Sequence, residues 1–135
     1  MDVYPINNAY LYHLGDYAVL DEIGVVRVTG IDSETIVVVD DKLQEYFLNP
    51  DELKPLAISE YILEKTVFER YKIIKHPLHI EAIFTGHIHG KLYQLIGHIY
   101  DAKSIWQFNW TVIHHVHQLQ SLLKIVEPKY RLVLF

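Results

Sequence analysis

Cysteine is absent from this chain of 135 residues, and glycine and proline are few, at six and five. Without cysteine, the chain has no disulfide scaffold, no thiolate zinc site and no cysteine nucleophile. The low glycine and proline content excludes a collagen-like or linker-like chain. No apolar run approaches the ~20 residues that cross a bilayer, and the acidic start at Asp2 is unlike a signal peptide. We therefore expect a cytoplasmic protein with no membrane partner.

The sequence also lacks the common catalytic motifs. It contains no G-x-S-x-G nucleophile elbow, no phosphate-binding P-loop and no G-x-G-x-x-G dinucleotide fingerprint. Adjacent carboxylates occur at Asp40-Asp41 and Asp51-Glu52. Neighbouring residues of a strand face opposite ways, and those in turns are usually solvated. These absences favour a protein that is not an enzyme, and we expect no cofactor.

What the sequence does contain is divided unevenly along its length. Half of the residues are hydrophobic, which excludes a disordered chain and is enough for one core or two small ones. The net charge of −5 combines −10 in residues 1–69 with +5 in residues 70–135, and eight of the nine histidines lie in the second part. This asymmetry has two interpretations: an anion-binding half, or two halves that attract each other within one molecule or across a dimer.

Residues 15–54 carry a pattern of short strands separated by tight turns. β-branched residues dominate the strands, and glycine, aspartate and asparagine mark the turns. Four strands are expected, at Tyr17–Leu20, Val25–Thr29, Thr35–Val39 and Glu45–Leu48. Short strands this closely spaced are typical of a small, strongly bent barrel of the SH3-like type.

The rest of the chain predicts a second sheet and two helices. Ser59 is the expected N-cap of a short connecting helix. Later elements are expected as strands at Arg70–Lys75, Leu78–Phe84, Leu92–Tyr100 and Ile105–Ile113, a helix from His114 to Val126, and a last strand at Arg131–Phe135. We therefore predict an α+β, mainly β protein in three parts: an N-terminal SH3-like barrel (1–56), a connecting helix (57–68), and an antiparallel sheet with one C-terminal helix (69–135).

Three segments carry a recognisable pattern: Leu14–Ala18, Leu53–Leu63 and Val116–Leu122. In this order they resemble the I-G-N-x-V, L-x-P-I-P-L-T-x-x-x-L and V-H-Q-L-Q-N-L segments of a family of small uncharacterised proteins from prophages and mobile elements of gut bacteria. Asp16, Ala18 and Ala57 stand where that family usually has Asn, Val and Pro. The resemblance implies a phage-related origin, and it implies no activity, cofactor or catalytic residue.

The histidine-rich second half contains candidate metal ligands. His87 and His89 are two residues apart, so on a strand both imidazoles would face the same way. His114 and His117, at the start of the predicted last helix, would share a helical face. A zinc site needs at least three protein ligands, and for a His-based site we consider His87, His89 and His114. The alternative is that Gly86 to Gly90 forms a hairpin turn whose histidines are solvated.

A histidine–carboxylate pair is also expected in the second half. If Leu78–Phe84 is a strand, His79 and Glu81 share a face and can pair. Such a pair at a surface is worth under ~1 kcal/mol. His76 and His98 lie on neighbouring segments.

The segment from His117 to Gln120 has two interpretations. As a binding site, His117, Gln118 and Gln120 would present an imidazole and side-chain amides to a partner. As structure, the same groups would hydrogen-bond open backbone groups of the adjoining sheet near the helix start.

Aromatic residues favour a role in protein contacts. Trp106 and Trp110 are four residues apart, so on one strand they would share a face, and tyrosine is abundant at ten residues. These residue types are enriched in interface cores. We therefore favour a non-enzymatic interaction module that binds an unknown protein partner or itself.

Nucleic-acid binding is the alternative function, with the basic second half supplying phosphate contacts and stacking. The residues considered are Arg70, Lys72, Lys75, Lys91 and Lys103, with Tyr71, Tyr93 and Trp106 between them. The negative net charge and the scatter of the basic residues oppose this interpretation.

Overall fold

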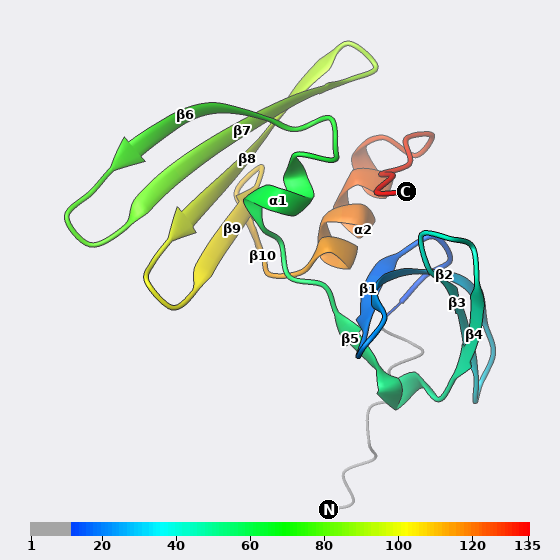
Figure 1. The fold of residues 1–135 in the computed structure, drawn as a ribbon. Helices are drawn as coiled ribbons and strands as arrows, with labels where there is room; N and C mark the ends of the chain where they lie inside the picture. The colour runs from blue at the N-terminus through cyan, green and yellow to red at the C-terminus, as the bar shows by residue number, and fades with distance from the viewer. Residues whose placement is uncertain (1–11) are drawn as a thin grey trace, which may run out of the picture. The chain divides into compact units, whose positions relative to one another are not determined.

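The structure is a computed structural model that describes residues 12–135 (Figure 1). It is mainly β, with two five-stranded antiparallel sheets and two α-helices, α1 (Glu60–Leu63) and α2 (Val116–Val126). The predicted α+β, mainly β class is therefore confirmed. The chain divides into two compact units, Met1–Leu56 and Ala57–Phe135, and residues 57–68 belong to the second. Residues 1–11 of the predicted first part lie outside the described residues.

The first unit is a meander of short strands. Its sheet has the order β4-β3-β2-β1-β5, and all neighbouring strands are antiparallel. The strands are β1 (Tyr17–Leu20), β2 (Gly24–Ile31), β3 (Ile36–Val39), β4 (Glu45–Leu48) and β5 (Leu53–Pro55). The sequence pattern misses β5 because three residues are too few to show an alternation of period two.

The sheet of the first unit is open. A 3₁₀ helix at Pro50–Glu52 separates β4 from β5, and β5 pairs with β1. β4 and β5 are the two edges, so the described residues form no closed barrel and the predicted barrel is not confirmed. Its core is mainly aliphatic and draws on all five strands. It contains Tyr12, Ala18, Leu20, Val26, Val28, Ile36, Val38, Leu48 and Leu53.

The second unit has longer strands. Its sheet has the order β10-β9-β8-β7-β6, again antiparallel throughout. The strands are β6 (Glu69–Lys75), β7 (Ile80–Ile88), β8 (Lys91–Ile99), β9 (Ser104–Phe108) and β10 (Thr111–Ile113). Ser59 is the N-cap of α1, where its hydroxyl oxygen accepts a hydrogen bond from the backbone N–H of Ile62 at 3.2 Å.

Two predicted strand boundaries in this sheet are wrong. Gly86 does not break β7, which continues to Ile88, because the missing Cβ lets the strand pass the ring of Phe68: a Cβ at Gly86 would lie 3.1 Å from that ring. The predicted strand Ile105–Ile113 is two strands, β9 and β10, joined by a turn at Asn109-Trp110. Both turn residues have positive φ, which ends the extended conformation there.

The C-terminal region also differs from its prediction. Helix α2 begins at Val116 with His115 as its N-cap, so His114 lies before the helix. The segment 131–135 forms no strand, although it is largely apolar, and of its residues only Leu132 is buried. The burial of the segment does not alternate as it would in a half-covered strand.

The two faces of the second sheet differ in burial. One face is the core of the unit and is largely aromatic, with Phe84, Tyr93, Trp106 and Phe108 all buried. The helices of the unit lie beside the sheet (Figure 1). The opposite face, which we call the outer face, carries half-buried or exposed side chains. By strand register it comprises Lys72, Ile74, Glu81, Ile83, Thr85, His87, Leu92, Gln94, Ile96, His98, Ile105, Gln107 and Val112.

Candidate functional site

The two tryptophans lie in opposite environments, so the predicted shared face is wrong. Trp106 in β9 is 1% exposed and packs in a tilted arrangement on Phe84, with ring centroids 5.8 Å apart. Its indole N–H donates to the Ser104 hydroxyl at 3.1 Å. Trp110 is 91% exposed. The turn at Asn109-Trp110 interrupts the alternation that would have placed both rings on one face.

The backbone at Trp110 is in an unusual conformation. Its φ is 77°, in the left-handed region, and Asn109 before it has φ 45°. A two-residue hairpin turn of this kind prefers Asn-Gly, because both residues need positive φ. For a residue with a Cβ this conformation costs roughly 1–2 kcal/mol. The sheet therefore presents a large, exposed aromatic side chain on strained backbone at the tip of its last hairpin.

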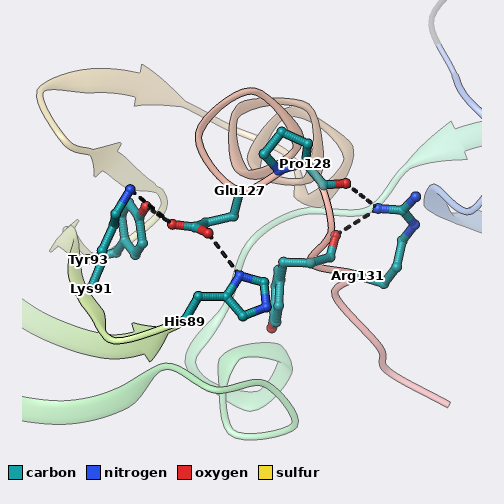
Figure 2. A network of polar contacts seen from close by, with 7 residues as sticks. His89, Lys91, Tyr93, Glu127, Pro128 and Arg131 are labelled. Carbon is teal, nitrogen blue, oxygen red and sulfur yellow. Dashed lines mark hydrogen bonds and ion pairs between the residues drawn. The ribbon is translucent and has the colours of Figure 1, made fainter.

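A buried carboxylate lies at the end of α2. Glu127, the C-cap residue, is 6% exposed and accepts a hydrogen bond from the Tyr93 hydroxyl. Its other oxygen lies 2.9 Å from His89 Nδ1, and Lys91 Nζ lies 3.9 Å from the carboxylate. Figure 2 shows these three side chains converging on Glu127 from the β7–β8 hairpin. The contacts tie the tip of that hairpin to the end of the helix.

The electrostatics of this network favour an ionised carboxylate. The hydrogen bond from Tyr93, followed by the one from His89, lowers the pKa of Glu127 from its usual value. The same bond to Glu127 is the main cause that raises the pKa of Tyr93. The sequence gives little sign of this network, because its members are 34 or more residues apart from Glu127 along the chain. Only the inward-facing position of Tyr93 in β8 and a carboxylate at the helix end hint at it.

The predicted metal ligands do not gather. His87 lies in β7 and faces outward, whereas His89 lies in the turn with φ 50°, so the expected shared face is lost. His114 is exposed and precedes α2. Among residues 12–135, no group of three or more His, Asp or Glu side chains is placed to hold a metal ion. His89 instead bonds Glu127.

Of the residues from His117 to Gln120, Gln118 is the one whose side chain caps the start of α2. The side-chain oxygen of Gln118 accepts the backbone N–H groups of His114 at 2.7 Å and His115 at 3.0 Å. His117 is buried, with its ring stacked 5.7 Å from that of His115. Burial and a nearby His114 charge lower the pKa of His115, with burial the larger cause. Gln120 is half-buried on the same helix.

The basic residues considered for nucleic acid are divided between surfaces. Arg70 pairs with Phe84 and Lys72 with Ile83, which alternate between the two faces of the sheet. Lys91 lies beside Glu127, and Lys103 lies over the Tyr100 ring at 6.0 Å from its centroid. These four residues form no continuous basic track.

No helix in the described part of the chain is long and apolar enough to cross a membrane.

Comparisons with other proteins found no relative of the chain. No model of a protein family, no curated protein and no solved structure matches the chain.

Proposed function

We propose that the protein is a non-enzymatic interaction module whose contact surface is centred on Trp110. The observation that carries the proposal is that this ring is exposed to solvent on a residue whose backbone is strained. Strained backbone that persists in a fold is concentrated at functional positions, and tryptophan is among the residue types that dominate binding energy at interfaces. Trp106, which the sequence pattern assigned to the same surface, is buried against Phe84 and lies outside it.

The outer face extends the proposed surface. Val112, two residues beyond Trp110, and Leu92 on β8 belong to this face and are exposed apolar side chains. Polar groups at Gln94 and Gln107 lie between them in the register. An exposed mixture of apolar anchors and amide groups matches the composition of transient protein interfaces.

If the partner is a second copy of the same chain, the proposal can be tested directly with purified protein. Sedimentation velocity over a wide concentration range should show the wild type forming dimers or larger species. Trp110→Ala should weaken this association by about 30-fold or more, the effect of losing a hot-spot residue. Phe47→Ala is the matched control, because Phe47 is an exposed aromatic side chain on β4 of the first unit. A wild type that stays monomeric throughout, or a Trp110→Ala variant that associates as the wild type does, would contradict the self-association.

Nucleic-acid binding is the alternative. The division of the basic residues between surfaces gives it less support. A shift assay at low salt separates the two functions, because phosphate binding weakens steeply as salt is added.

We propose in addition that the first unit is an SH3-like module and that the chain is of phage or mobile-element origin. The connectivity supports the first point: a four-strand meander is followed by a 3₁₀ helix and a short strand that returns to β1. The order of the three resembling segments supports the second. An experimental structure of the first unit within the full chain, and the genomic neighbourhood of the gene, test these two points.

A further inference from the structure

We infer that three histidines at one end of the outer face form a proton-sensitive latch, which closes the β6–β7 turn onto the end of β8 at neutral pH and releases it in mild acid. The latch consists of His76, just after β6, His79, just before β7, and His98 in β8. The imidazole of His79 contacts those of both His76 and His98.

The rings form a short stack. The His76 and His79 rings are nearly parallel, 14° apart in plane, with centroids 4.5 Å apart. On its other side His79 stacks with Tyr100 at 4.9 Å. His98 Nδ1 lies 3.4 Å from His79 Nε2, which is hydrogen-bonding distance. The turn itself is closed by the backbone N–H of His76, which donates to the carbonyl of His79 at 2.9 Å.

The contact between His79 and His98 depends on the number of bound protons. A hydrogen bond between two imidazole nitrogens needs one donor and one acceptor, which neutral rings provide. When both rings are protonated, both nitrogens are donors, and two positive charges lie 3.4 Å apart. The closed arrangement therefore tolerates at most one proton on this pair, whereas an open turn tolerates one on each ring.

The charged surroundings offset only part of this repulsion. Glu81 is the carboxylate shared by the cluster, 3.6 Å from His76 Nε2 and 3.9 Å from His98 Nδ1. The residues paired with Glu81 and His98 on the flanking strands, Ile74 and Ile105, carry no charge. Beyond Tyr100, Lys103 adds a further positive charge. Glu81 thus lies close to two of the three imidazoles, and full protonation leaves the cluster with excess positive charge.

Release would free one end of an edge strand. β6 is the edge of its sheet and is largely exposed, so the latch is an attachment at the end that leads into β7. Imidazole ordinarily changes charge between about pH 7 and 5.5, a range in which other side chains keep theirs. The structural consequence is local opening of the turn in that range, while the rest of the sheet stays folded.

Amide hydrogen exchange of the full chain at a series of pH values tests the latch. We expect the protection of the His76 amide to fall below neutral pH, by about tenfold per pH unit for each additional proton that the open turn binds. His79→Phe keeps the stacked ring and removes the two ring nitrogens, so the protection of the His76 amide in this variant should not depend on pH in this way. His87→Phe is the matched control, because His87 is an outer-face histidine of β7 outside the cluster and should behave as the wild type.

Glu81→Gln supplies a second test should His79→Phe fail to fold. Without the carboxylate, protonated rings are less stable in the closed turn, so opening should begin at a higher pH than in the wild type. Protection that does not change with pH in the wild type would overturn the latch, as would an unchanged pH dependence in His79→Phe. Stoichiometric zinc binding that shifts the NMR signals of these three imidazoles would overturn it in favour of a metal site.

Discussion

Two hairpins of the second sheet, β7–β8 and β9–β10, are built on the same kind of turn and differ in the residues that occupy it. The β7–β8 turn is His89-Gly90, with φ of 50° and 80°, and the β9–β10 turn is Asn109-Trp110, with φ of 45° and 77°. Gly90 meets the demand for positive φ without strain, because it has no Cβ. Trp110 meets the same demand with the largest side chain available.

The two hairpin tips also differ in how firmly they are attached to the rest of the unit. His89, Lys91 and Tyr93 connect the first tip to the buried Glu127 (Figure 2). At the second tip, the Asn109 backbone N–H meets the Gln94 carbonyl at the long distance of 3.4 Å, and Trp110 extends into solvent. The first tip therefore contributes to stability, whereas the second presents an exposed contact group at a cost in stability.

The largest expected effect on stability distinguishes Trp106, in strand β9, from Trp110, at the tip of the β9–β10 hairpin. Trp106→Ala should lower the free energy of unfolding by about 3–5 kcal/mol, because it removes a fully buried ring from an aromatic core. Trp110→Ala should change it by no more than about 0.5 kcal/mol, as for an ordinary surface substitution. Urea unfolding followed by circular dichroism measures both. Equal losses of unfolding free energy in the two variants would contradict this difference between Trp106 and Trp110.

Exchanging the turn residues tests the strain directly. Trp110→Gly should raise the free energy of unfolding by up to about 1 kcal/mol, since relief of the left-handed backbone outweighs the flexibility of glycine. Gly90→Trp should lower it by roughly 1–2 kcal/mol. A Cβ at Gly90 meets no atom within 4 Å, so this loss comes from the backbone alone. A neutral Gly90→Trp would show that the turn accepts tryptophan without strain.

The smallest expected effect concerns Glu127, which binds the tip of the β7–β8 hairpin. Glu127→Gln keeps an acceptor oxygen but removes the charge, so it should be modestly less stable than the wild type at pH 7. Because folding lowers the pKa of Glu127, its contribution is complete above the usual value of 4.5 and is lost as pH falls through the lowered value. The difference between the urea midpoints of the two proteins should therefore shrink in acid. Glu64→Gln, at an exposed position of the same unit, is the control. If the difference in urea midpoint between Glu127→Gln and the wild type did not change with pH, the stabilising role of the ionised Glu127 would be contradicted.

The fold was predictable where the local pattern was strong. Four strands of the first unit follow from the alternating pattern. Helical spacing places Val116, Leu119, Leu123 and Val126 on one side of α2; the first three are buried, whereas Val126 at the helix end is 39% exposed. The boundaries at Gly86 and at Asn109-Trp110 were not predictable. Gly86 lies in a strand because Phe68, distant in sequence, packs against it. The second turn lacks the glycine that usually marks such turns.

The candidate site was predictable only in part. Trp110 is recognisable as a large aromatic residue, but its exposure depends on a turn that the sequence does not mark. The pairing of His79 with Glu81 was expected from alternation on β7. In the structure Glu81 instead meets His76 and His98, which come from the preceding turn and the next strand. Strand register, which is a property of the whole sheet, decides such contacts.

By itself, the sequence determined the mainly β class, the change from an acidic to a basic, histidine-rich part, and the absence of cysteine chemistry. These properties depend on composition and on neighbours close along the chain. The tertiary structure alone decided that Trp106 is buried while Trp110 is exposed, that Glu127 receives the β7–β8 hairpin, and that three histidines stack at one end of a sheet. Each of these contacts depends on strand pairing and packing between residues far apart in the chain, which local patterns do not specify.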